Sequence, residues 1–211
     1  MPNAPITNVT FYFDPACPWT FIASQWIRKV ANSTGISLEF KPFSLAIKNR
    51  GNEIPENYRA AMEVSLAMLR VMVKIRSEFE KSQANSLVSE IYLRFGTQFH
   101  LDGAAAATDL EGILADFGIS DEIALARKDD SLDAAIEESM AEALALTGDD
   151  VGVPIIALNS ADSRQGFFGP ILCRVPDDTE AMELWTHFVG LSQLGCFFEL
   201  KRKKISGPAL S

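Results

Sequence analysis

The chain has 211 residues and is poor in the residue types that mark several common protein classes. It has three cysteines, two histidines and no Cys-X-X-Cys pair, so the sequence predicts neither a disulfide framework nor a metal site. Its apolar stretches are soon interrupted by charge, which argues against a membrane span. The formal net charge of -9 argues against the clustered basic face that nucleic-acid binding requires.

The first residues of the chain lack the positive charge and apolar core of a secretory signal peptide. We therefore expect a cytoplasmic location, where thiols stay reduced and structural disulfides are rare. The three cysteines, Cys17, Cys173 and Cys196, are widely spaced. We expect Cys173 and Cys196 to be small core residues, which leaves Cys17 as the candidate for chemistry.

The N-terminal part of the chain predicts a strand, a helix and a second strand. Residues 8–13 are rich in β-branched and aromatic side chains, which favour a buried strand. A helix is predicted over residues 17–33, because Pro18 suits the first helical position and Gly35 suits the end. Residues 36–43 alternate between apolar and polar side chains, as a strand does. This order gives a βαβ unit with parallel strands.

The remaining pattern completes a known architecture. From about residue 56 to residue 148 apolar side chains recur at three- and four-residue steps, which predicts four or five packed helices. Residues 154–158 and 164–168 predict a β-hairpin, and a last helix follows to about residue 194. The predicted fold class is α/β, a thioredoxin-like fold with an inserted all-helical domain. We expect a discontinuous thioredoxin-like domain, 1–55 and 149–211, and a helical insertion, 56–148.

Cys17 lies where the first strand ends and the first helix begins. The first helical N–H groups have no backbone partners, and the helix dipole adds partial positive charge there. Both effects stabilise a thiolate, so we expect a depressed pKa for Cys17 and nucleophilic reactivity. The alternative is a buried, inert cysteine. Thr20, one turn later, could donate a hydrogen bond to the thiolate and lower its pKa further.

A second sequence element is Gly152-Val153-Pro154, at the start of the predicted hairpin. Thioredoxin-fold proteins place a cis-proline at this strand, opposite the active-site cysteine. The position of Pro154 therefore favours a cis peptide bond, and the backbone of Val153 would be free to pair with an extended thiol substrate. The alternative is a trans proline that starts an edge strand.

Several motifs together resemble the DsbA-type family of mycothiol-dependent nitroreductases. They are Phe13-Asp14-Pro15-Ala16-Cys17-Pro18-Trp19, Gly148-Asp149-Asp150-Val151-Gly152-Val153-Pro154, Phe167-Phe168-Gly169-Pro170 and Phe197-Phe198-Glu199-Leu200-Lys201-Arg202. The resemblance implies mycothiol, a low-molecular-weight thiol, as cofactor, and no metal. It also places Trp19, Asn49 and Tyr58, with Val153 and Pro154, around the thiol and cofactor. Their alternative roles are helix packing for Trp19, a turn for Asn49 and a helix start for Tyr58.

One departure from the family pattern matters for the mechanism. Redox-active members carry Cys-Pro-Trp-Cys, whereas this chain has Thr20 at the place of the second cysteine. Cys17 could work as a monothiol, whose mixed disulfide is resolved by free mycothiol. Alternatively the site only activates a bound thiol, which resembles kappa-class glutathione transferases. Resolution by Cys173 or Cys196 is the least favoured route.

Three functions stay open from the sequence. The first is a monothiol, mycothiol-dependent oxidoreductase that reduces mixed disulfides, peroxides or nitro compounds. The second is a mycothiol or glutathione S-transferase of kappa-like type, and the third is a non-catalytic thiol-binding regulatory protein. The expected partners are a low-molecular-weight thiol and a small-molecule or thiol substrate. Neither nucleic acid nor a membrane is expected, and a homodimer stays open.

Overall fold

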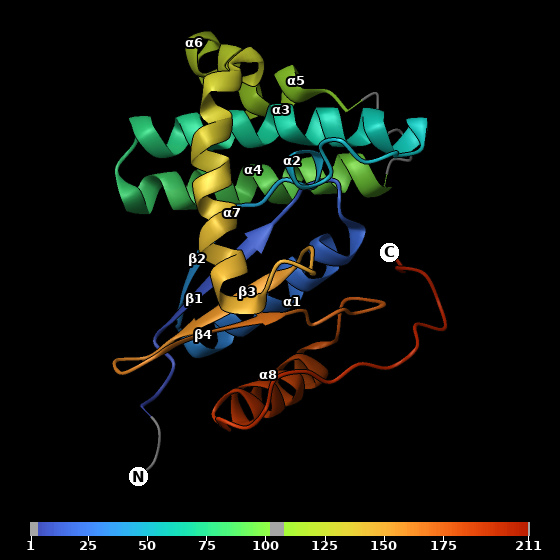
Figure 1. Cartoon of the computed structure of the whole chain (residues 1–211). Helices are drawn as coiled ribbons and strands as arrows, with labels where there is room; N and C mark the ends of the chain where they lie inside the picture. The colour runs from blue at the N-terminus through green and yellow to red at the C-terminus, as the bar shows by residue number, and fades with distance from the viewer. Residues whose placement is uncertain (1–3, 102–107, 211) are drawn as a thin grey trace.

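The structure is a computed structural model that describes residues 4–101 and 108–210. A four-stranded sheet with the order β2-β1-β3-β4 lies below a group of helices (Figure 1). The elements in chain order are β1 (Asn8–Phe13), α1 (Pro18–Thr34), β2 (Ser37–Pro42), α2 (Leu45–Lys48), α3 (Glu56–Glu78), α4 (Lys81–Leu101), α5 (Leu110–Asp116), α6 (Asp121–Ala124), the 3-10 helices η2 (Leu125–Lys128) and η3 (Asp130–Leu132), α7 (Asp133–Thr147), β3 (Ile155–Asn159), β4 (Arg164–Phe168) and α8 (Asp178–Ser192).

The βαβ unit forms as the sequence predicts. β1 pairs in parallel with β2 and antiparallel with β3, and β3 and β4 make the predicted hairpin. Pro18 opens α1, and Gly35 ends it in the left-handed conformation with φ 74°. The carboxyl end of the central strand β1 is therefore followed closely by the amino end of α1, and Cys17 lies between them.

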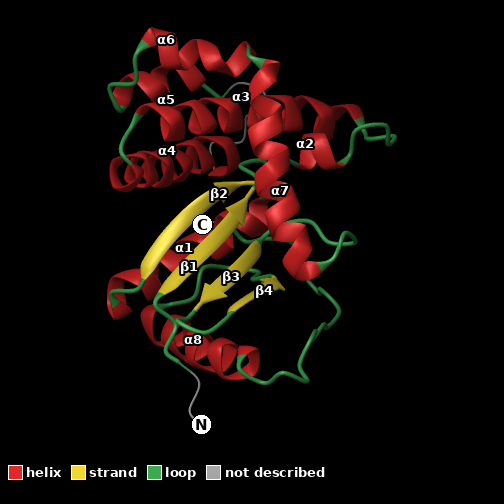
Figure 2. Ribbon diagram, turned by 60° about the vertical axis from the view of Figure 1, so that its left-hand side comes forward, coloured by secondary structure: helices red, strands yellow, loops and turns green. Residues whose placement is uncertain are grey.

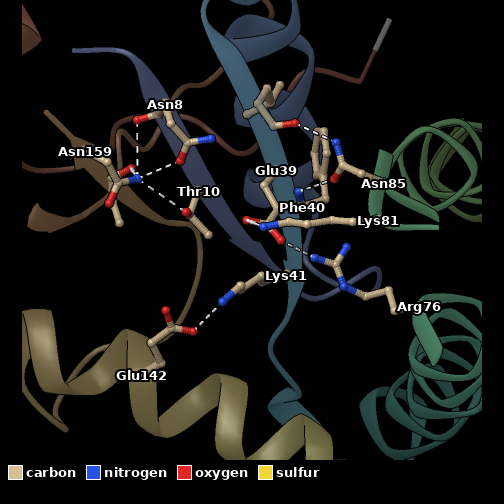
Figure 3. A network of polar contacts seen from close by, with 12 residues as sticks. Asn8, Thr10, Glu39, Phe40, Lys41, Arg76, Lys81, Asn85, Glu142 and Asn159 are labelled. Carbon is tan, nitrogen blue, oxygen red and sulfur yellow. Dashed lines mark hydrogen bonds and ion pairs between the residues drawn. The ribbon is translucent and has the colours of Figure 1, made fainter. Parts of the chain in front are cut away.

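Helices cover both faces of the sheet (Figure 2). On one face α1 packs against α8, where the Trp26 indole N–H donates to the Ala181 carbonyl at 3.0 Å. On the other face α7 crosses the sheet, and Glu142 pairs with Lys41 of β2 at 2.6 Å and with Arg164 of β4 at 2.5 Å. Figure 3 shows the Lys41 pair together with other polar contacts of the sheet.

The predicted helical region contains α3, α4, α5, α6 and α7 within the described residues. The predicted fold class is confirmed, while the division into domains at residues 55/56 and 148/149 stays a prediction. Part of the predicted helical region, residues 102–107, lies outside the described residues. The short helix α2 was not predicted, because four residues are too few to show a helical period. In the described ranges, no helix has the length and apolar character needed to cross a membrane.

The expectation that Cys173 and Cys196 are core residues is wrong. Both are free thiols exposed to solvent. Cys173 lies in the loop between β4 and α8, and Cys196 lies beyond the end of α8. Connecting segments of this kind run over the surface, so a small apolar side chain there is not drawn into the core.

Candidate active site

Cys17 and Val153, which are 136 positions apart in sequence, meet at the carboxyl end of β1. Cys17 is the N-cap residue of α1 and only 8% exposed. Its thiol donates a hydrogen bond to the Val153 carbonyl, with an Sγ–O distance of 3.7 Å. The peptide bond between Val153 and Pro154 is cis. The fold thus brings the predicted nucleophile against the backbone of the predicted thiol-pairing segment.

The prediction of a depressed pKa for Cys17 is wrong in this structure. Burial raises the pKa of the Cys17 thiol above its ordinary value, and the nearby Asp14 carboxylate also raises it. Hydrogen bonding by the side chain and amide of Thr20 and by the amide of Trp19 lowers this pKa, but by less than burial raises it. Loss of hydration therefore outweighs the favourable helix terminus. The thiol is protonated and held by the Val153 carbonyl.

Thr20 lies in the first turn of α1 and is fully buried. Its hydroxyl is among the buried polar atoms that lack a hydrogen-bond partner of normal geometry. It is nevertheless close enough to Cys17 to lower the pKa of the thiol. A buried hydroxyl that makes no hydrogen bond costs stability. A hydrogen bond from the Thr20 hydroxyl to Sγ would relieve this cost when the thiolate forms.

Asp14 is a site residue that the sequence interpretation missed, since it is named there only as part of the motif around Cys17. Its side chain is fully buried. It accepts hydrogen bonds from the Ala16 amide at 2.7 Å, the Leu45 amide at 2.6 Å and the Ser65 hydroxyl at 2.6 Å. Burial raises the pKa of Asp14, and the three donated hydrogen bonds oppose that rise. The available signal was an acidic residue placed three positions before the cysteine.

The three donors to Asp14 come from three different segments of the chain. Ala16 precedes Cys17, Leu45 begins α2, and Ser65 lies in α3. Asn49 is the C-cap residue of α2, and Tyr58 lies in the first turn of α3. A single buried carboxyl thus connects the segments that carry the predicted nucleophile and two predicted cofactor residues.

The predicted cofactor residues take different positions around the buried Asp14 carboxyl. Trp19 lies in the first turn of α1 and is partly buried, whereas Tyr58 is 58% exposed. The Asn49 side chain donates to the Leu45 carbonyl at 2.8 Å and so caps α2. Within the described chain neither Asn49 nor Tyr58 hydrogen-bonds to Cys17. Their role in binding a cofactor therefore stays a prediction.

His100, at the end of α4, is a second neighbour that the sequence interpretation missed. Its ring Nε2 lies 2.9 Å from the Pro15 carbonyl, two residues before Cys17, and its ring stacks on Phe21 at 5.2 Å. Burial lowers the pKa of His100 to about 4, although the contact with Pro15 raises it somewhat. His100 is therefore neutral at pH 7 and supports the loop that precedes the nucleophile.

The lowered pKa of His100 predicts loss of stability in mild acid. The unfolded state takes up the proton near pH 6.5, whereas the folded state resists it until about pH 4. Stability is thus full above pH 6.5 and falls as the pH drops toward 4, by on the order of 3 kcal/mol. Urea unfolding of the wild-type chain and of His100→Gln at pH 7.5 and pH 5 measures this. An equal acid-induced loss in both proteins would contradict the assignment.

Metal-ligating side chains do not gather at this site. Across residues 4–101 and 108–210, no group of three or more His, Cys, Asp or Glu side chains could hold a metal ion. The chemistry available to the described residues is that of a thiol, a hydroxyl, a buried carboxyl and backbone amides.

Comparisons with solved structures agree with the fold. A cytosolic disulfide reductase DsbM from Pseudomonas aeruginosa superposes with a TM-score of 0.56 at 15% identity, covering 87% of this chain and 99% of that one. A DsbA1 from Wolbachia pipientis gives 0.56 at 15% identity, covering 90% and 88%. A 2-hydroxychromene-2-carboxylate isomerase gives 0.53 at 17% identity, covering 87% and 95%. These similarities show a shared DsbA-like thioredoxin fold.

Sequence comparison is more specific. An uncharacterized protein of Mycobacterium tuberculosis, Rv2286c, is 27% identical over 215 residues, which cover 94% of this chain and 83% of that protein. The family model described as mycothiol-dependent nitroreductase Rv2466c matches residues 16–202, from just before Cys17 into the C-terminal segment. The resemblance noted in the motifs is confirmed, and the chain belongs to the Rv2466c-like family of mycothiol-dependent nitroreductases.

Proposed function

We propose that this chain is a thiol-dependent oxidoreductase that uses Cys17 as its single nucleophile and mycothiol as its thiol partner. The observation that carries the proposal is the meeting of the Cys17 thiol with the Val153 carbonyl beside a cis-proline. Membership of the Rv2466c-like family supports the choice of mycothiol. The departure of this chain from Cys-X-X-Cys supports a monothiol reaction.

The donor set of the site fits a thiol ligand. The buried Thr20 hydroxyl has no hydrogen-bond partner of normal geometry, so a sulfur anion in this place gains a hydrogen bond without breaking another. Trp19, Asn49 and Tyr58 would contact the cofactor, and the Val153 backbone, next to Pro154, would align it by pairing. Bound mycothiol supplies a thiol that reduces an oxidised Cys17.

In the proposed reaction the Cys17 thiol first loses its proton to water. The amides of Trp19 and Thr20 and the Thr20 hydroxyl then stabilise the thiolate. The thiolate attacks one sulfur of a disulfide substrate, so that a Cys17–sulfur bond forms, the substrate bond breaks and the second sulfur leaves as a thiolate. A low-molecular-weight thiolate attacks the mixed disulfide, releases Cys17 and forms a new disulfide. Thr20 has no thiol, so it cannot resolve the intermediate.

The test is adduct formation in a protein with Cys173→Ser and Cys196→Ser. We expect mycothiol disulfide to add one mycothiol to Cys17, and free mycothiol to remove it, as measured by intact mass. Because burial raises the pKa of Cys17, the rate of adduct formation should increase about tenfold per pH unit from pH 6 to pH 8. The absence of an adduct contradicts the monothiol proposal, whereas an adduct that forms at the same rate over this range contradicts only the raised pKa of Cys17.

A transferase of kappa-like type is the second candidate. One observation favours it: Cys17 is a protonated donor in this structure, since its thiol hydrogen-bonds to the Val153 carbonyl. A donor in that position could stabilise the thiolate of a bound cofactor without forming a disulfide, and a serine could replace it. The effect of Cys17→Ser therefore separates the two functions.

A further inference from the structure

The C-terminal segment returns to the candidate active site. From the end of α8 it follows one side of the molecule without regular secondary structure toward the amino end of α1 (Figure 1). Along this path the Lys204 ammonium lies over the Trp19 ring, with 4.9 Å between Nζ and the ring centroid. Trp19 follows Cys17 by two residues in the same helical turn, so Lys204 brings a positive charge to the nucleophile's neighbourhood.

Contacts on both sides of Lys204 fix the segment to the body of the protein. Before it, the Phe197 ring stacks on Phe167 of β4, with 6.2 Å between centroids. After it, the Ala209 amide donates to the Cys173 carbonyl at 2.6 Å, and Leu210 packs against the hydrophobic core. The position of Lys204 over Trp19 is therefore supported at two points and does not depend on the cation–π contact alone.

The charge of Lys204 is available to a ligand. Among the described residues Lys204 forms no ion pair, and a contact with an aromatic face leaves the other side of the ammonium open. The chain carries a net charge of -9, yet four consecutive basic residues, Lys201 to Lys204, lie in this segment. A local positive charge on the surface of an otherwise acidic protein attracts anions to that point.

We propose that Lys204 is a specificity-determining residue of the Cys17 site, one that favours disulfide substrates carrying a carboxylate or another anionic group. The inference rests on the proposed function, because it concerns the disulfides that Cys17 attacks. Lys204 does not enter the exchange reaction itself. It raises the local concentration of anionic substrates beside Trp19 and offsets the repulsion that the acidic protein exerts on them.

Two small disulfides of different charge test this inference on the full chain with Cys173→Ser and Cys196→Ser. 5,5′-Dithiobis(2-nitrobenzoate) carries two carboxylates, whereas 4,4′-dithiodipyridine is uncharged at neutral pH. Each transfers one aryl thiol to Cys17 and releases the other, which absorbance detects. Lys204→Gln should lower the rate with the anionic reagent about fivefold and leave the rate with the neutral reagent within about twofold, as expected for the loss of one nearby unit charge in water.

Matched variants separate this role from others. Lys201→Gln removes the same charge from the same segment and should leave the ratio of the two rates within about twofold of the wild-type ratio. Lys204→Arg keeps the charge at position 204 and should give the wild-type ratio. The Lys204→Gln effect should vanish near 1 M salt, where charges are screened within about 3 Å. If the ratio of the two rates is unchanged in Lys204→Gln, because both rates stay the same or change equally, the inference is overturned and the proposed function stays intact. No reaction of Cys17 with either reagent would overturn both.

Discussion

A Cys17→Ser variant is expected to lose mycothiol adduct formation completely and to lose thiol-dependent disulfide reduction by at least about a thousandfold. The reason is that a serine hydroxyl cannot form the sulfur–sulfur bond through which exchange proceeds, and loss of a nucleophile commonly costs this much or more. Initial rates with mycothiol and a disulfide substrate measure the effect. The fold should tolerate the change, because one oxygen replaces one sulfur at a side chain 8% exposed.

The same variant discriminates between the candidate functions. Under the transferase alternative, conjugation of mycothiol to an electrophile survives Cys17→Ser within about tenfold, because a hydroxyl can still donate to a bound thiolate. Cys173→Ser is a suitable control, since this exposed thiol lies in the loop before α8 and should be dispensable. Retention of disulfide reduction in Cys17→Ser would sink the oxidoreductase proposal. Turnover absent from the wild type as well would favour a non-catalytic thiol-binding protein.

An Asp14→Asn variant is expected to lower both the stability of the fold and the pKa of Cys17. The free energy of unfolding should fall by about 2–4 kcal/mol, because an amide NH2 would face at least one of the three hydrogen-bond donors that the carboxylate accepts from. The pKa of Cys17 should also fall, since the nearby negative charge that raises it is removed. Urea unfolding and the ultraviolet absorbance of the thiolate against pH measure the two effects.

Ser65→Ala is the matched control for Asp14. The Ser65 hydroxyl donates to Asp14 and accepts from the Ala16 amide at 3.1 Å. Its loss removes these hydrogen bonds but keeps the negative charge of Asp14. We expect destabilisation of about 1–2 kcal/mol without a fall in the pKa of Cys17. If both variants lower the pKa of Cys17 equally, the hydrogen bonds of Asp14 affect Cys17 only by positioning the chain around it. The electrostatic role of Asp14 is then contradicted.

Much of the fold could be predicted from the sequence because its strands and first helix carry strong local signals. Residues 8–13 and the hairpin at residues 154–168 show short apolar runs bounded by turn residues, and Pro18 and Gly35 mark the ends of α1. The short helix α2 and the exposure of Cys173 could not be predicted. Neither depends on a repeating pattern, and a small apolar residue in a loop has no periodicity from which its burial could be inferred.

The family, the thioredoxin-like order of elements and Cys17 as candidate nucleophile could be inferred from sequence alone, since each rests on neighbouring residues or on motifs. The protonation of Cys17, the hydrogen bonds of Asp14 and the placement of Lys204 on Trp19 could be seen only in the folded chain. Helix-end effects extend over one turn and can be inferred locally. Burial and contacts between distant segments depend on how the whole chain packs, and at Cys17 loss of water outweighs the favourable position at the helix end.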